Sequence, residues 1–203
     1  SSWRKGPDQR RHDGLPLIPW YLQKMRIYEE THGTRILDYL DLHFYPQATG
    51  VRLAPIGEAQ TEALRLRSTR ALWDPEYIDE SWIGEAIALI PRMRQWVDEY
   101  YPNTKLAITE YNWGATDHIN GALAQADVLG IFGREGLDLA TVWAMGKADD
   151  PVAYAFRMYR NYDGKGSSFG DTSIYSTSSD QDTLAVYAAE ESTSGAVTIM
   201  VIN

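Results

Sequence analysis

The chain has 203 residues, of which 44% are hydrophobic, so it can bury a core and form one domain or one and a half. A formal charge of −9 argues against binding to nucleic acid or to an anionic membrane, since either partner requires a basic patch. The absence of cysteine excludes a disulfide framework and a thiolate metal site. Thirteen Tyr and seven Trp against four Phe indicate wet, half-buried surfaces, where a large ring benefits from a polar tip.

Apolar runs in the sequence are too short to cross a membrane, because none reaches the roughly 18 residues that a span requires. The first four residues, SSWR, do not have the character of a signal peptide. The last eight, AVTIMVIN, form an apolar run of strand character that is still open at the final residue. We therefore expect the chain to be a segment of a longer protein.

The pattern begins with a helix and a strand. Apolar residues at helical spacing predict a helix over residues 17–29, with Gly33 after it as the residue that ends the helix. Residues 35–46 then alternate between apolar and polar side chains, which predicts a strand that stops at its proline. One face of this strand is apolar, and the other carries Asp41, His43 and Tyr45.

The segment 47–77 shows little periodicity, and a stretch of that length predicts a functional or disordered loop. A helical pattern resumes at Asp79, a candidate N-cap, and continues to Val97, with Pro91 dividing or kinking the helix. The later patterns predict a strand that ends at Glu110, a helix over 119–129, a strand over 137–145 and a helix that begins near Pro151.

Helices and strands therefore alternate from residue 15 to residue 163, which predicts an α/β fold with parallel strands joined by crossover helices. From residue 164 onward, short apolar runs are separated by turn-rich stretches such as GKGSSFGDTS. This texture predicts antiparallel strands of a small sandwich. We expect two modules, residues 1–163 and residues 164–203.

Chemically active side chains stand at the ends of the three predicted parallel strands. The first strand delivers His43 and Tyr45, the second Glu110 with Asn112 and Trp113, and the third Trp143. A (β/α) barrel builds its active site at the carboxyl ends of its strands. A carboxylate, hydrogen-bonding groups and an aromatic plate suit a sugar, although a strand-end glutamate is also a common cap or solvated loop residue.

Each of these side chains also has a structural interpretation. His43 is either a hydrogen-bonded barrel histidine or an acid or base, and Trp143 is either core or a sugar platform. Tyr45 is structural, or it donates a hydrogen bond that stabilises an ionised carboxylate. Trp73 either lines a substrate cleft or is structural. The arginines of its segment, Arg65, Arg67 and Arg70, either line the same cleft or pair with acidic side chains. No residues have metal-ligand spacing and no glycine-rich phosphate loop follows a strand, which disfavours metal and nucleotide chemistry.

Long ordered stretches of the chain resemble the later part of the catalytic module of glycoside hydrolase family 44, which contains endoglucanases and xyloglucanases. These stretches are LDLHFYPQ, LRSTRALWDPEYIDESWI, LAITEYNWGATDHINGALAQADVLGIFGREGLDLATVWA, YAFRMYRNYDGKGSSFGDTS and LAVYAAEESTSGAVTIMVIN. The resemblance implies a (β/α)8 TIM-like barrel, with residues 1–163 as its C-terminal portion and residues 164–203 as part of a β-sandwich domain. It also implies endo-hydrolysis of β-1,4-glucan backbones with retention of configuration.

The resemblance also implies roles for individual residues. Glu110, in the stretch TEYN, corresponds to the nucleophile on barrel strand seven, and His43 and Tyr45 correspond to groups at the end of strand six. Trp143 resembles the aromatic platform that barrel glycosidases in general carry on strand eight. Further substrate contacts are expected from four residues: Tyr111, Asn112, Trp113 and Trp73.

One group of the expected mechanism lies outside the chain. Retaining hydrolysis requires a second carboxyl about 5–5.5 Å from the nucleophile, and in family 44 it is a Glu on strand four. We interpret Asp41 as structural, because it lies deeper in the barrel than His43 and Tyr45. The isolated polypeptide is therefore expected to be inactive, and its open sheet edges are expected to make it unstable or prone to aggregation.

The implied substrates are cellulose, xyloglucan and mixed-linkage β-glucan. The intact enzyme is expected to be secreted and monomeric, to need no cofactor, and to bind neither nucleic acid nor membrane, with a structural cation possible but not identifiable. Two alternatives stay open: a barrel that binds glycans without cleaving them, and a (β/α)8 hydrolase of another substrate that uses Glu110 as a base.

Overall fold

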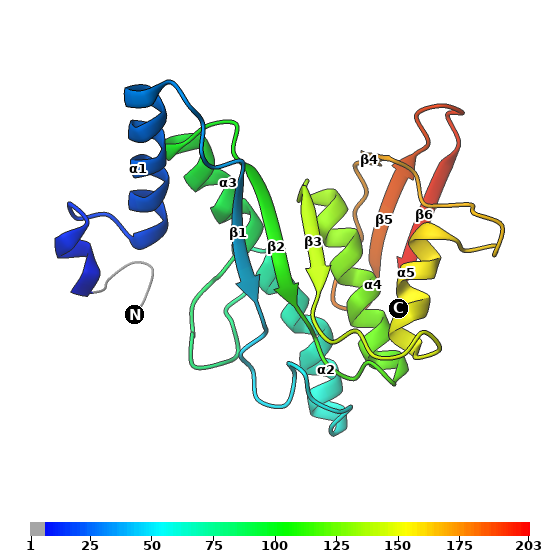
Figure 1. Cartoon of the computed structure of the whole chain (residues 1–203). Coiled ribbons are helices and arrows are strands. Elements are labelled where there is room, and N and C mark those ends of the chain that lie inside the picture. The colour runs from blue at the N-terminus through cyan, green and yellow to red at the C-terminus, as the bar shows by residue number, and fades with distance from the viewer. Residues whose placement is uncertain (1–6) are drawn as a thin grey trace.

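The computed structural model describes residues 7–203 and contains two sheets (Figure 1). The first part of the chain forms α1 (Leu17–His32), β1 (Tyr39–Phe44), α2 (Ala59–Arg67), α3 (Leu89–Tyr100), β2 (Lys105–Tyr111), α4 (Ile119–Arg134), β3 (Leu139–Val142) and α5 (Pro151–Arg160). The last part forms β4 (Thr172–Ile174), β5 (Ala185–Glu190) and β6 (Val197–Ile202). Short 3₁₀ helices cover Pro7–Arg11 and Ser68–Leu72. The prediction about residues 1–4 falls outside the described residues.

The two sheets differ in strand direction. Strands β1, β2 and β3 are parallel and lie in that order, and β4, β5 and β6 form an antiparallel sheet in chain order. Helix α4 lies between the sheets, and α5 packs beside it (Figure 1). The α/β class and the antiparallel strands after the last helix are confirmed, whereas the boundary at residue 163 stays a prediction.

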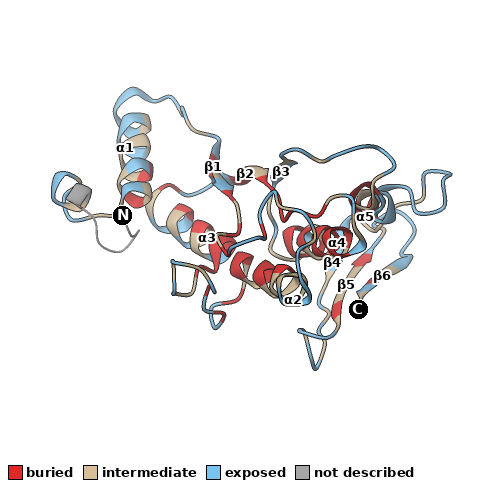
Figure 2. Cartoon of the chain, turned by 90° about the horizontal axis from the view of Figure 1, so that it is seen from below, coloured by how far each residue is buried: buried red, intermediate tan, exposed pale blue. Residues whose placement is uncertain are grey.

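The core lies where α3 and α4 cover one face of the parallel sheet (Figure 2). Residues Leu106 and Ile108 of β2 are fully buried in it, together with Met93 of α3 and Ile131 of α4. Helix α1 contributes much less, since its only buried residues are Pro19 and Leu22. None of the helices in the described part of the chain is long and apolar enough to span a membrane.

Local chemistry explains the ends of several elements. Helix α1 ends at Gly33, whose φ of 68° is the left-handed conformation in which glycine is favoured, as predicted. Helix α5 begins at Pro151, where the missing backbone N–H costs nothing. Pro91 falls in the first turn of α3 for the same reason, so it neither divides nor kinks the helix.

Two predictions about the middle of the chain are wrong. The segment 47–77 is not one long loop, because it contains α2 and a 3₁₀ helix packed against α4. No helix starts at Asp79, whose carboxylate instead accepts the backbone N–H of Ser81 at 3.0 Å in a local turn. The carboxylate of Asp79 satisfies the backbone as an N-cap would, and the helix begins ten residues later, at Leu89.

Candidate active site

Three predicted residues meet at the carboxyl ends of β1 and β2. In the sheet His43 lies opposite Glu110, so the two side chains leave adjacent strands at the same level. Nδ1 of His43 lies 3.2 Å from Oε2 of Glu110, and the hydroxyl of Tyr45 donates to the same oxygen at 3.1 Å. The Glu110 side chain is about one-third exposed, at 31%, so a substrate can still reach the carboxylate.

Tyr45 is suited to hold this carboxylate in one orientation. Burial and the hydrogen bond to Glu110 raise the pKa of the Tyr45 phenol, so it stays protonated and remains a donor. Its backbone is held in turn, because Nε2 of Gln47 donates to the Tyr45 carbonyl at 2.7 Å. Arg52 is linked to Gln47 at 3.4 Å, which ties the loop after β1 to the site.

Asn112 positions backbone rather than substrate. Its Nδ2 donates to the carbonyls of Trp143 at 2.5 Å and Ala144 at 3.2 Å, and its Oδ1 accepts the N–H of Gly114 at 2.6 Å. The residue is buried, so its amide has no group left for a sugar. Ala144 has a φ of 53°, a strained value for a residue with a Cβ, and Asn112 holds it there. The expected substrate contact from Asn112 is thus replaced by support of the turn that carries Trp143.

Trp143 is the one aromatic residue of the predicted set that is exposed at a strand end. It follows β3 directly, its N–H donates to the carbonyl of Tyr111 at 3.1 Å, and its side chain is largely open to solvent. An exposed indole at the carboxyl end of a strand can stack on a sugar ring, because one face of a sugar is apolar.

Trp113 and Tyr111 do not face the site. Both are buried: Nε1 of Trp113 donates to the hydroxyl of Ser68 at 3.0 Å, and the Tyr111 hydroxyl accepts from Gln125 at 3.0 Å. Both rings pack in the core on the helix side of the sheet. The expectation that they contact substrate does not fit this burial, because a ring enclosed by the core cannot stack on a glycan.

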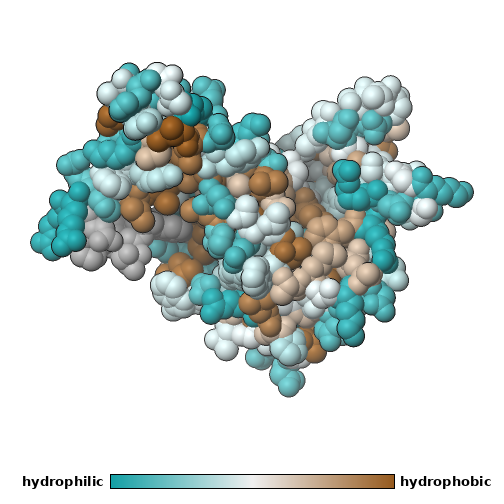
Figure 3. All heavy atoms as spheres, viewed as in Figure 1, coloured by the Kyte–Doolittle hydropathy of each residue, from teal (hydrophilic) through white to brown (hydrophobic). Residues whose placement is uncertain are grey.

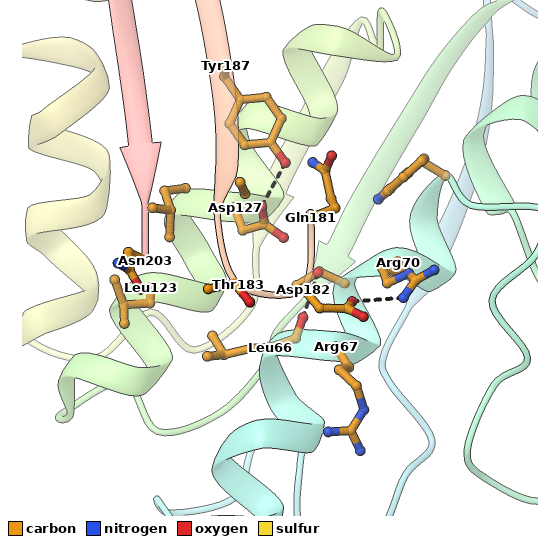
Figure 4. Close-up of a pocket in the computed structure, with 14 residues that line it drawn as sticks. Leu66, Arg67, Arg70, Leu123, Asp127, Gln181, Asp182, Thr183, Tyr187 and Asn203 are labelled. Atoms are coloured by element: carbon orange, nitrogen blue, oxygen red, sulfur yellow. Dashed lines mark hydrogen bonds and ion pairs between the residues drawn. The ribbon is translucent and has the colours of Figure 1, made fainter. Parts of the chain in front are cut away.

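Trp73 lies at a different place. It lines a pocket between the 3₁₀ helix and β5, together with Arg70 and Tyr187 (Figure 4). The guanidinium of Arg134 lies 4.2 Å from its ring centroid, a cation–π contact. The structure therefore separates Trp73 from the residues around Glu110, and its expected stacking role has no support there.

The arginines near Trp73 follow the structural interpretation. Arg67 forms two hydrogen bonds with Glu80, at 3.0 and 2.9 Å, which lower the pKa of that carboxyl. Arg70 bridges Asp74 at 2.7 Å and Asp182 at 2.8 Å, so it joins the 3₁₀ helix to the loop before β5. These arginines bind acidic side chains of the chain itself.

Arg65 is the residue whose role the sequence did not reveal. It is fully buried on α2, and every N–H of its guanidinium has an acceptor. The acceptors are the carbonyls of Trp113, Ile56, Gly50 and Pro55 and the Oδ1 of Asn120, at 2.7 to 3.1 Å. One side chain thus joins the loops that follow β1 and β2 to the start of α4. An arginine in a polar segment gives no signal of such burial.

Within residues 7–203 no group of three His, Asp or Glu side chains is arranged to hold a metal ion. The side chains described at the strand ends are one carboxylate, one imidazole, one phenol and one exposed indole.

Parallel strands with crossover helices, and a phenol-held carboxylate at their carboxyl ends, have the form of a (β/α)-barrel glycosidase site. A family model described as glycoside hydrolase family 44 matches residues 1–48. Endoglucanase A from Paenibacillus lautus is 40% identical over 180 residues, which cover 85% of this chain and 26% of the relative. These matches support the chain as a fragment of a glycoside hydrolase family 44 protein.

Solved structures agree over almost the whole chain. CelM2, a bifunctional glucanase-xylanase from a metagenome library, is 49% identical with a TM-score of 0.94, and the match covers 99% of this chain and 38% of that one. A Paenibacillus polymyxa xyloglucanase of family 44, solved with xyloglucan, is 36% identical with a TM-score of 0.89, over 98% and 41% of the two chains. The chain thus spans well under half the length of the relatives that it matches.

Proposed function

We propose that the protein to which this chain belongs is a retaining endo-β-1,4-glucanase, and that Glu110 is its nucleophile. The observation that carries the proposal is the Glu110 carboxylate at the end of β2, with the Tyr45 hydroxyl at 3.1 Å and His43 at 3.2 Å from one oxygen. The other oxygen is left for the anomeric carbon. The similarity to family 44 endoglucanases and xyloglucanases supports cellulose, xyloglucan and mixed-linkage β-glucan as the substrate class.

In the first step Glu110 attacks the anomeric carbon, and the bond to the leaving glucan oxygen breaks as an acid protonates that oxygen. This forms a glycosyl ester on Glu110. In the second step the same acid, now a base, takes a proton from water, and the water oxygen attacks the anomeric carbon and frees Glu110 with retained configuration. The acid/base is a carboxyl outside this chain, and Trp143 supports the sugar at the cleavage point.

The test is Glu110→Gln in an enzyme of full family length that contains this chain. Loss of a nucleophile is expected to lower kcat on xyloglucan and soluble β-glucan by far more than a hundredfold, with little change in KM. The matched control is Glu190→Gln, an exposed glutamate at the end of β5, which is expected to keep wild-type turnover. Turnover by Glu110→Gln within about tenfold of wild type would remove Glu110 from the mechanism.

The same assays separate the alternatives. A wild-type protein that binds xyloglucan without releasing reducing ends is a glycan-binding barrel, and one that cleaves a different polymer is a hydrolase of another class. A polymeric glucan also supports an extracellular location as part of the proposal, since such a polymer is degraded outside the cell.

A further inference from the structure

Strand β2 carries an extra residue immediately before Glu110. On β1 the two-residue step from Asp41 to His43 lies opposite a three-residue step on β2, from Ala107 to Glu110. Strand β3 shows the same mismatch, since Ala140 lies opposite Ile108 and Val142 opposite Tyr111. Both neighbours therefore place a β-bulge on β2, within residues 108–110. Bulges are rare in parallel sheets and re-aim the side chains that follow them.

The bulge changes the face on which Glu110 lies. In a regular strand Thr109 and Glu110 would point to opposite faces. Here Thr109 hydrogen-bonds to Asp41 on β1, and Glu110 hydrogen-bonds to Tyr45 directly after β1, at alternate positions that share one face. Tyr111 returns to the helix side, where it accepts from Gln125 of α4. If the same residues continued as a regular strand, Glu110 would lie opposite Phe44 and point toward the helices instead of the barrel interior.

The carboxylate of Asp41 holds the bulge. Its Oδ1 accepts the backbone N–H of Thr109 at 3.0 Å, and its Oδ2 accepts the Thr109 hydroxyl at 2.5 Å. A bulge takes the backbone of its extra residue out of the regular ladder, so this N–H needs another acceptor. The hydroxyl of Thr141 on β3 donates to the Thr109 carbonyl from the other side. Polar groups from both neighbouring strands thus fix the residue that precedes Glu110.

We propose that Asp41 and Thr109 are positioning residues that set the orientation of the Glu110 carboxylate by stabilising this bulge. The inference rests on the proposed function, since it assigns the bulge to the same reaction. Asp41 does not act as an acid or base: both of its oxygens accept hydrogen bonds from Thr109. Its effect reaches the sugar only through the direction in which Glu110 points.

The test uses a full-length enzyme and an activated 2-deoxy-2-fluoro-β-cellobioside, which accumulates the ester on the nucleophile. The rate of ester formation on Glu110 is followed by mass spectrometry of peptides, and cello-oligosaccharide binding is measured by calorimetry. Thr109→Val removes the hydroxyl and keeps the volume, Asp41→Asn keeps one oxygen acceptor, and Thr109→Ser restores the hydroxyl. The matched control is Thr104→Val, which removes a buried hydroxyl at the other end of β2.

Thr109→Val and Asp41→Asn are expected to slow labelling about 10- to 100-fold, because small misplacement of a reacting group is costly, while oligosaccharide binding stays within about twofold. Thr109→Ser is expected to recover most of the rate, and Thr104→Val to lower stability without slowing labelling. Labelling of Thr109→Val at the wild-type rate, or slowing that merely follows the loss of folded protein, would overturn the positioning role. A wild-type enzyme whose Glu110 is never labelled would overturn the proposed function as well.

Discussion

At the residue scale, the Glu110 carboxylate is held by two side chains from the neighbouring strand and the loop after it. His43, Tyr45 and Glu110 come together because the carboxyl ends of parallel strands share one edge of the sheet. A position near a strand end did not predict the surroundings of Asn112 and Trp113, because β2 ends at Tyr111 and the chain then turns into the core. The β-bulge on β2 could not be predicted from the sequence either, because the pattern of apolar and polar residues in LAITEY gives no sign of an extra residue.

The hydrogen bond from Tyr45 to Glu110 leads to a prediction about Tyr45→Phe. A hydrogen bond to a charged group contributes about 1.5–3 kcal/mol, so kcat is expected to fall about 10- to 100-fold. The raised pKa of Tyr45 keeps the hydroxyl protonated at every pH below its ordinary value near 10. The ratio of wild-type to variant kcat is therefore expected to be constant from about pH 5 to 9, and a ratio that approaches one below pH 9 would contradict this role.

At the element scale, helix α2 is anchored by a buried arginine, Arg65, whose burial the sequence pattern did not predict. The segment 47–77 lacks an apolar stripe, so periodicity gave no helix. The helix is stabilised instead by Arg65, whose guanidinium organises two loops and the start of α4. Burial lowers the pKa of this guanidinium, yet arginine stays charged at neutral pH.

Arg65→Met in the full-length enzyme is expected to destabilise the fold by about 3–5 kcal/mol, because it leaves buried acceptors without donors. Arg65→Lys is expected to recover little, since three donors on a single nitrogen cannot match a planar fork of five. Urea unfolding measures both variants. Arg94→Lys on α3, whose guanidinium makes an exposed contact to Gly136, is the control and should change stability by less than about 0.5 kcal/mol.

At the scale of the whole molecule, the two sheets are joined by polar contacts as well as by packing. The Tyr187 hydroxyl on β5 donates at 2.7 Å to Asp127 on α4, at the pocket of Figure 4. The Thr69 hydroxyl and Arg134 also favour the ionised form of this carboxylate. Burial nevertheless raises the pKa of Asp127, so the folded state binds its proton more tightly than the unfolded chain does.

This shift gives a pH-dependent prediction. The stability that Asp127 contributes is complete below its unfolded pKa of about 3.9 and is lost as pH rises through its higher folded pKa. Asp127→Asn, which stays neutral, is therefore expected to gain stability relative to wild type as pH rises from 4 to 8. Thermal unfolding across that range measures the difference. Tyr187→Phe removes one donor to the carboxylate, so the decline of stability should continue to higher pH than in wild type. A difference between Asp127→Asn and wild type that does not change with pH would contradict the assignment.

The chain on its own presents unpartnered apolar surface. Exposed large side chains gather on α1, on the loop that follows it and on the edge strand β1, and brown surface marks this region in Figure 3. They are Leu17, Tyr21, Ile27, Ile36 and Tyr39. An apolar edge of this kind favours association.

The 203-residue polypeptide is expected to release no reducing ends from xyloglucan at micromolar concentration, because the proposed mechanism needs a second carboxyl that we expect to lie outside these residues. It is also expected to self-associate, which light scattering over a concentration series would detect. A monomeric polypeptide with measurable turnover would contradict both expectations.

The position of α4 between the two sheets has a consequence for exchanging parts among family members. Ten of the sixteen residues of α4 are buried, and Gly130 lies so close to the Tyr187 ring that an added Cβ would come within 2.3 Å of it. A helix that is buried over most of its surface is matched to several neighbours at once. A chimaera joined between α5 and β4 would pack α4 against a β5 from another parent. Such a chimaera is therefore expected to fold only when α4 and the antiparallel sheet come from the same parent.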